Sequence, residues 1–93
     1  MHGERFAALV DVIERLLGPD GCPWDRAQSP ESMRRFVLEE AFELVEAIDA
    51  GDPCALREEL GDLLMQVVFL GELARARGWF TTDDAIEGIR DKL

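Results

Sequence analysis

The stretch that decides the fold lies in the middle of the chain, where residues 38–64 read LEEAFELVEAIDAGDPCALREELGDLL. Apolar residues recur at helical spacing on both sides of the Gly-Asp-Pro triplet at positions 51–53. Gly51 suits the left-handed conformation that ends a helix, Asp52 suits the cap of the next helix, and Pro53 suits its first position. The pattern therefore predicts two antiparallel helices joined by a tight turn, which is an α-helical hairpin.

Two pairs of acids occupy matching positions in this hairpin. Glu40 and Glu43 are three residues apart and share one helix face, as do Glu59 and Asp62 on the second helix. Glu43 lies 8.5 residues before the centre of the turn and Glu59 lies 7.5 after it, while Glu40 lies 11.5 before and Asp62 lies 10.5 after. Each facing pair is level to within one residue, or about 1.5 Å of helix rise. The spacing predicts that four carboxylates converge at one height.

The surroundings of Asp62 favour a metal ion at this point. Residues 60–70 are almost wholly apolar, and Gln66 is the other strongly polar residue there. A helix that is apolar nearly all round is buried, so we expect Asp62 to be enclosed or to line a cleft. An unpaired buried carboxylate is costly, and residues 58–74 contain no Lys or Arg that could pair with it. We therefore predict Mg²⁺, with Mn²⁺ as a substitute, held by carboxylate oxygens.

Two alternatives compete with this site. In the first, glutamates form a solvated stripe that pairs with arginines, and this interpretation is the simplest one for Glu31, Glu46, Glu58 and Glu72. It fits the four inner acids poorly, because of their register and the apolar setting of Asp62. In the second, the acids form a di-iron centre in a helical bundle, but the Glu-x-x-His motifs of such centres are missing from the sequence.

The rest of the chain extends the helical pattern. We expect a first helix from Gly3 to Leu17, a loop from Gly18 to Ser29, and a second helix capped by Ser29 that ends near Ala50. The third helix begins at Pro53 and ends around residues 75–78, and a last helix, capped by Thr81 or Thr82, continues to Leu93. The predicted fold is all-α: one domain, residues 1–93, in which shorter helices flank the hairpin and an oligomeric helical bundle completes the core.

Composition limits the partners of the protein. Twenty acidic and ten basic residues give a net charge of −10, which disfavours binding to a nucleic acid polymer and repels polyphosphates unless a cation intervenes. The longest apolar run, residues 63–70, is too short to cross a bilayer, and the N-terminus lacks a signal-peptide pattern. We therefore expect a cytoplasmic protein with no membrane partner. Cys22 and Cys54 are expected to be reduced, partly buried thiols, and a zinc site is not expected because His2 is the single histidine.

Three segments in order resemble the MazG nucleotide pyrophosphohydrolases: Gly21-Cys22-Pro23-Trp24-Asp25, Leu38-Glu39-Glu40-Ala41-Phe42-Glu43 and Glu58-Glu59-Leu60-Gly61-Asp62-Leu63-Leu64. The resemblance covers the chain from about Leu16 to Leu93. It implies the fold of the all-α NTP pyrophosphatase superfamily. It also implies hydrolysis of nucleoside triphosphates to the monophosphate and pyrophosphate, a reaction that serves to clean nucleotide pools.

The same resemblance implies roles for particular residues. The family holds Mg²⁺ with ExxE and ExxD acids, which match Glu40, Glu43, Glu59 and Asp62. Its members are homodimers or homotetramers whose sites use more than one subunit. In related proteins a lysine of the last helix, followed four residues later by an arginine, contacts the phosphates. Asp91-Lys92-Leu93 resembles the start of that motif, so Lys92 is the candidate phosphate ligand.

Other residues have two interpretations each. Glu39 adjoins the acid pair and is a candidate catalytic group that orients the attacking water, or else a solvated acid. Trp24 is a candidate to stack on a nucleotide base, or else a loop anchor. Gly61 is expected to allow close approach of helices. The phenylalanines at positions 36, 42 and 69 are expected in the core or at a subunit interface. The rival function is that of a non-catalytic helical oligomerisation or interaction module that retains the acidic metal site.

Overall fold

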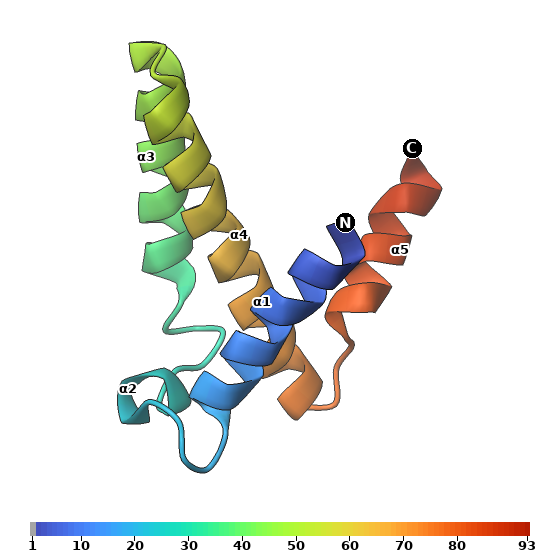
Figure 1. Ribbon diagram of the computed structural model, residues 1–93. Helices are drawn as coiled ribbons and strands as arrows, with labels where there is room; N and C mark the ends of the chain where they lie inside the picture. The colour runs from blue at the N-terminus through green and yellow to red at the C-terminus, as the bar shows by residue number, and fades with distance from the viewer. Residues whose placement is uncertain (1) are drawn as a thin grey trace.

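The computed structural model describes residues 2–93, and these form five helices and no strand (Figure 1). The helices are α1 (His2–Leu17), α2 (Pro23–Arg26), α3 (Arg34–Ala50), α4 (Pro53–Ala76) and α5 (Thr82–Lys92). Helices α3 and α4 form the antiparallel hairpin, α1 lies across the second half of α4, and α5 follows beyond the end of α4. The all-α fold class and the central hairpin are therefore confirmed.

The turn between α3 and α4 forms as its sequence predicts. Gly51 adopts the left-handed conformation, with φ of 67°, and its N–H donates to the carbonyl of Ile48. The Asp52 carboxylate accepts from the backbone N–H groups of Cys54 and Ala55 at 3.0 and 3.4 Å. These bonds satisfy helix ends that would otherwise lack partners, so the turn fixes where each helix starts and stops.

The connection before the hairpin differs from the prediction. Ser29 does cap a turn, because its Oγ accepts from the N–H of Ser32 and the Oγ of Ser32 accepts in return from the N–H of Ser29. That turn stops at Met33, however, and α3 begins only at Arg34. The predicted loop also contains the short helix α2, with Cys22 as its cap and Pro23 at its first position. Four residues are too few to produce a helical repeat of apolar positions.

The core gathers where α1, the turn at Met33 and the second half of α4 meet. Its buried members are Ile13, Met33, Val68 and Phe69, and apolar residues of α1 pack around them. Phe36 packs partly buried against this core, whereas Phe42 is exposed. Helix α1 covers the later half of α4 only. The part of the hairpin nearer the turn therefore keeps apolar side chains in contact with solvent.

Helix α5 is anchored to α4 at its first turn. Of the two threonine caps considered, Thr81 is the one used, because its Oγ accepts from the N–H of Asp84 while the Asp84 carboxylate accepts from the N–H of Thr81. Thr82 lies against Gly71 of α4, where any β-carbon would collide with the threonine hydroxyl. Both cysteines are free thiols, as predicted; Cys22 is partly buried, whereas Cys54 is exposed, so the expectation that it is partly buried was wrong.

Within residues 2–93, no helix is both long enough and apolar enough to cross a membrane.

Glycines distinguish tight from open positions in this fold. A β-carbon at Gly21 would lie against the carbonyl oxygens of Arg15 and Leu16, whereas one at Gly88 in α5 would meet nothing within 4 Å. We expect Gly21→Ala to lower the free energy of unfolding by roughly 1–3 kcal/mol, because backbone atoms must move. Gly88→Ala, the control, should raise it by about 0.5–1 kcal/mol, since alanine is the better helix former. Urea denaturation followed by circular dichroism measures both, and equal effects would contradict this packing.

Candidate metal centre

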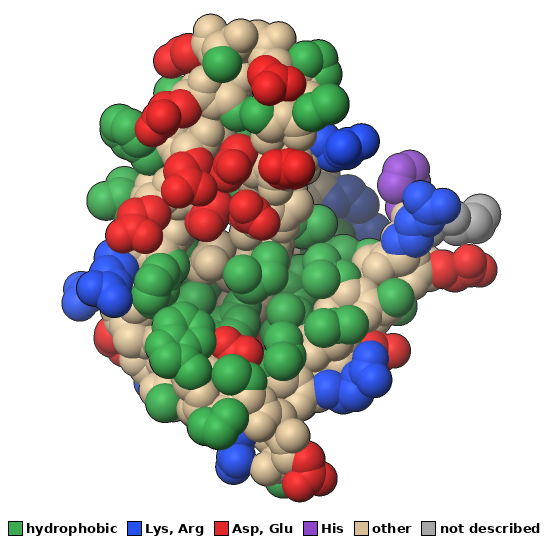
Figure 2. Space-filling model, turned by 60° about the vertical axis from the view of Figure 1, so that its left-hand side comes forward, with side chains coloured by type: hydrophobic (Ala, Val, Ile, Leu, Met, Phe, Trp, Pro, Cys, Tyr) green, Lys and Arg blue, Asp and Glu red, His purple; other side chains and the backbone are tan. Residues whose placement is uncertain are grey.

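Four carboxylates converge on one side of the hairpin. Glu40 and Glu43 from α3 and Glu59 and Asp62 from α4 each place one carboxylate oxygen within 4.8 Å of the others. Figure 2 shows a compact group of acidic side chains lying across the two helices. The predicted convergence is therefore observed. It arises because the turn sets the register and the three-residue spacing sets the face.

The carboxylates of Glu40 and Glu59, which are the two partly buried acids of the cluster, lack hydrogen-bond partners among residues 2–93 for one oxygen each. Oxygen Oε2 of Glu40 and Oε2 of Glu59 are buried and accept no hydrogen bond from any described residue. Desolvation raises the pKa of both groups, and the nearby charges of Glu43 and Asp62 raise each further. Ion pairs between described residues form elsewhere, at Arg75, Arg77 and Arg90. The site therefore collects negative charge without any neutralising side chain from residues 2–93.

Exposure divides the four acids differently from the sequence-based prediction. Glu40 and Glu59 are partly buried, whereas Glu43 and Asp62 are exposed. The expectation that Asp62 is enclosed was wrong for the single chain. Leu60 and Leu64, on the same half of α4, are also exposed. The glutamates at the inner positions, rather than Asp62, are the acids that suffer most from desolvation.

This donor set suits a hard divalent cation. Carboxylate oxygens alone favour Mg²⁺, Mn²⁺ or Ca²⁺ over zinc or copper, which bind more often through nitrogen and sulfur. The unpartnered Oε2 atoms of Glu40 and Glu59 are the kind of buried acceptor that a cation satisfies. Because Glu43 and Asp62 face solvent, a cation here would stay open to other oxygen ligands on that side.

Glu39 lies beside the cluster but outside it. Its side chain is exposed, and its charge contributes, as the smallest of several causes, to the raised pKa of Glu40. Two other glutamates predicted to be solvated, Glu46 and Glu58, are exposed as well. Glu31 is also exposed, and it forms an ion pair with Arg77 at 3.2 Å. These positions match the sequence-based interpretation.

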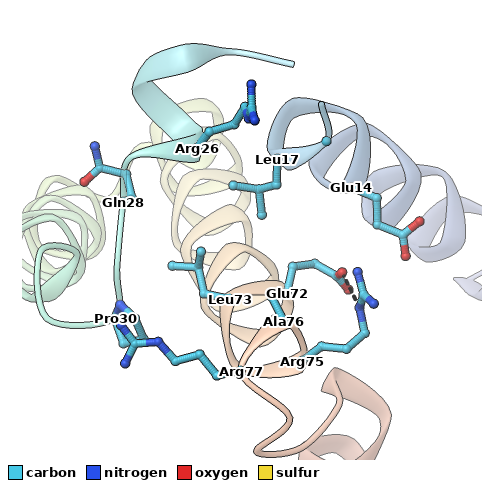
Figure 3. Close-up of a pocket in the computed structure, with 11 residues that line it drawn as sticks. Glu14, Leu17, Arg26, Gln28, Pro30, Glu72, Leu73, Arg75, Ala76 and Arg77 are labelled. Carbon is cyan, nitrogen blue, oxygen red and sulfur yellow. Dashed lines mark hydrogen bonds and ion pairs between the residues drawn. The ribbon is translucent and has the colours of Figure 1, made fainter. Parts of the chain in front are cut away.

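Glu72 corrects that interpretation. It is only 5% exposed, and the Nε of Arg75 donates to its Oε2 at 2.8 Å. The pair lines a cavity of about 360 Å³ between α1, the segment around Gln28 and the end of α4 (Figure 3). The sequence alone gives no sign that this glutamate is buried. Arg75, three residues later on the same helix face, pairs with Glu72 and so allows its carboxylate to be buried.

Trp24 and Phe36 form an edge-on aromatic pair with ring centroids 5.7 Å apart. Trp24 is nevertheless 55% exposed. Phe36 lies on α3 one turn before Glu40, so the pair is near the acidic cluster along the helix but not part of it. This arrangement suits both interpretations of Trp24, since one edge is anchored and much of the ring remains accessible.

Lys92 is not brought to the acids within one chain. It lies exposed in the last turn of α5, and Figure 1 shows the end of that helix well away from α3. Gly61 is also different from expectation. It is exposed, and a β-carbon there would meet nothing within 4 Å, so the prediction that it allows close approach of helices was wrong for the single chain.

One buried polar residue received no role from the sequence. Gln66 is 5% exposed, and its Oε1 has no hydrogen-bond partner among the described residues. The signal that could have found it is its spacing of seven from Glu59 and four from Asp62, which places it on their helix face.

Fold and site together define an all-helical protein whose central hairpin carries a four-carboxylate cluster suited to a divalent cation. Residues 28–93 match the family model described as the MazG nucleotide pyrophosphohydrolase domain. The chain belongs to that family.

Several named relatives are similar over almost the whole chain. The nucleoside triphosphate pyrophosphohydrolase/pyrophosphatase MazG of Thermotoga maritima is 47% identical over 91 residues, which are 98% of this chain and 36% of that protein. The nucleoside triphosphate pyrophosphohydrolases of Escherichia coli K12 and Mycobacterium tuberculosis are 43% and 40% identical, over 91% and 99% of this chain. The chain spans 33% and 28% of those two proteins, so it corresponds to about a third of its relatives' length.

The crowded acids predict a stability change that depends on metal and pH. The pKa of Glu59 is raised in the folded protein, so folding favours the protonated form of this group. The stability that Glu59 contributes is therefore present below the ordinary glutamate pKa and is lost as the pH rises through the raised pKa of the folded protein. We expect Glu59→Gln to raise the unfolding temperature of the metal-free protein at pH 8 and to leave it nearly unchanged at pH 4. Magnesium should stabilise the parent protein and stabilise the variant much less. Calorimetry with and without EDTA measures this, and Glu58→Gln is the matched control. A metal-free Glu59→Gln protein less stable than its parent at pH 8 would contradict the charge argument.

Proposed function

We propose that this chain, as one domain of residues 1–93, hydrolyses nucleoside triphosphates to the nucleoside monophosphate and pyrophosphate with Mg²⁺. The observation that carries the proposal is the cluster of Glu40, Glu43, Glu59 and Asp62, whose oxygens lie within 4.8 Å of one another with no neutralising cation from residues 2–93. The names of the relatives from Thermotoga maritima and Escherichia coli support the reaction.

The charge of the protein explains why a cation would be needed. A net charge of −10 repels a triphosphate, and the acidic cluster would repel it most strongly at short range. When bound, Mg²⁺ would supply charge neutralisation, polarise a phosphate oxygen and lower the pKa of a coordinated water. Mn²⁺, which takes similar oxygen ligands, is the expected substitute.

The residues of this chain would divide the work. Glu40 and Glu59 would hold the cation from inside the hairpin, and Glu43 and Asp62 would hold it from the solvent side. Glu39, exposed beside the cluster, would accept a proton of the attacking water and orient it. Trp24, with much of its ring accessible, would stack on the base.

We propose further that the working form is a homodimer or homotetramer. Both hairpin helices carry an exposed apolar stripe with members four and three residues apart; the stripes are Leu38, Phe42 and Val45 on α3, and Leu60, Leu64 and Val67 on α4. A second copy that covered these stripes would remove much apolar surface from water. It would also allow Lys92 of one copy to approach the acids of another, which it does not do within its own chain.

Activity tests the proposal directly. With Mg²⁺ and each nucleoside triphosphate in turn, we expect pyrophosphate and the monophosphate as products. Asp62→Ala and Glu59→Ala should each lower kcat by roughly a hundredfold or more, because a metal ligand is lost. Glu58→Ala, an exposed neighbour outside the cluster, should act at the parent rate. Release of single phosphate groups, or parent rates in both ligand variants, would overturn the assignment.

The non-catalytic interaction module is the alternative that this assay also addresses. A protein of that kind would form its normal oligomer but would not hydrolyse any nucleoside triphosphate. The relatives' names favour the enzyme. A role in clearing nucleotides from the cytoplasmic pool stays a prediction based on the family.

The apolar stripes give an independent test of assembly. We expect the parent protein to elute as a dimer or tetramer, and Phe42→Glu to dissociate it, because a charge would be buried in the interface. Val12→Glu, at a similarly exposed apolar position on α1, is the matched control and should leave the assembly intact. Light scattering coupled to size-exclusion chromatography measures the mass. A parent protein that is monomeric at all concentrations would contradict this proposal.

A further inference from the structure

Gln66 is a buried polar side chain that the fold leaves unsatisfied. Only 5% of the residue is exposed, and its Oε1 atom is buried without a hydrogen-bond partner among residues 2–93. Leaving such an acceptor unpaired costs about 1–3 kcal/mol, and native proteins rarely keep one without a reason. An apolar residue at this position of α4 would avoid that cost.

Helix geometry places Gln66 on the metal-ligand face of α4. At about 100° per residue, position 66 lies about 20° from Glu59 and about 40° from Asp62 around the helix axis, between the two. Side chains of a helix lean toward its N-terminus, so the amide of Gln66 leans back over the turn that carries Asp62. Gln66 therefore forms the closed, buried end of the same face on which Asp62 is exposed.

Oε1 of Gln66 has no hydrogen-bond partner among the described residues, and the residues beside it on the hairpin do not supply one. The carboxylates of Glu59 and Asp62 accept hydrogen bonds when ionised and do not donate them. On α3, the position level with Gln66 across the hairpin is Val37, and Phe36 precedes it; both side chains are apolar. An O–H or N–H group that comes with what binds at the cluster would supply the donor that these residues do not.

We propose that Gln66 is a positioning residue, whose Oε1 accepts a hydrogen bond from a water molecule bound to the cation at the acidic cluster. This inference rests on the proposed function, because it assumes that the four carboxylates hold a divalent cation. A coordinated water is a strong donor and fits beside ligands that can only accept. The hydrogen bond from this water to Gln66 would fix the orientation of the water at the buried end of the site.

The variants Gln66→Leu and Gln66→Met test this assignment, since both remove the acceptor and keep much of the volume. We expect each to weaken Mn²⁺ binding to the nucleotide-free protein by roughly tenfold or more and to lower kcat by about ten- to a hundredfold, with KM for the nucleotide nearly unchanged. Titration followed by water proton relaxation reports the Mn²⁺ affinity and the bound water together. Met65→Leu, a conservative change on another face of α4, is the control and should change neither quantity.

The metal-free protein provides a readout that a merely structural role would move. Because an unsatisfied acceptor is removed, the unfolding temperature in EDTA should stay the same or rise in both variants. A clear fall in it would assign Gln66 a structural hydrogen bond and overturn the proposal. Unchanged Mn²⁺ affinity would overturn it too, as would a raised KM with normal kcat, which would mean that the donor belongs to the nucleotide. If the parent protein releases no pyrophosphate, the proposed function fails, while the Mn²⁺ and stability measurements still decide the role of Gln66.

Discussion

Repulsion among four carboxylates is the main constraint on this structure, because the rest of the fold must hold α3 and α4 together against it. Glu40, Glu43, Glu59 and Asp62 lie closer together than unpaired acids prefer, and desolvation, together with the charge of the neighbouring carboxylates, raises the pKa of Glu40 and Glu59. Something else must hold α3 and α4 in place. The capped turn at Gly51 and Asp52 fixes the register, and the core around Val68 and Phe69 fixes the other end of α4. Stability is therefore provided away from the acids, where it does not interfere with their charge.

The hairpin has a packed part, at the second half of α4, and an open part, nearer the turn. This division explains how one small chain combines a stable fold with a charged site. Helix α1 covers the later part of α4, and there the helix buries Val68, Phe69 and Glu72, while Arg75, which pairs with Glu72, stays exposed. The earlier part carries the acids and keeps apolar side chains exposed. Within the cluster, Glu40 and Glu59 are partly buried, whereas Glu43 and Asp62 are exposed to solvent.

The sequence predicted the hairpin and its acids well because both follow from local rules. Turn chemistry at Gly51, Asp52 and Pro53 sets the register, and the register alone makes Glu43 level with Glu59. Burial was predicted poorly, because it depends on which surface α1 covers. Asp62 was therefore expected to be enclosed although it is exposed, and Glu72 was expected to be solvated although it is buried. The short helix α2 and the late start of α3 depend on a few capping bonds, which apolar periodicity does not reveal.

The compact turn of the hairpin has a consequence for how the site assembles. Glu43 and Glu59 are separated by 16 residues, and Glu40 and Asp62 by 22. Bringing such near neighbours together loses little loop-closure entropy, so these contacts are of low contact order and are available early in folding. The contact of α1 with the later half of α4 spans far more of the chain and must be made against a larger entropic cost. The arrangement of the four acids is consequently specified within one continuous segment, and the distant elements serve to retain it once it has formed.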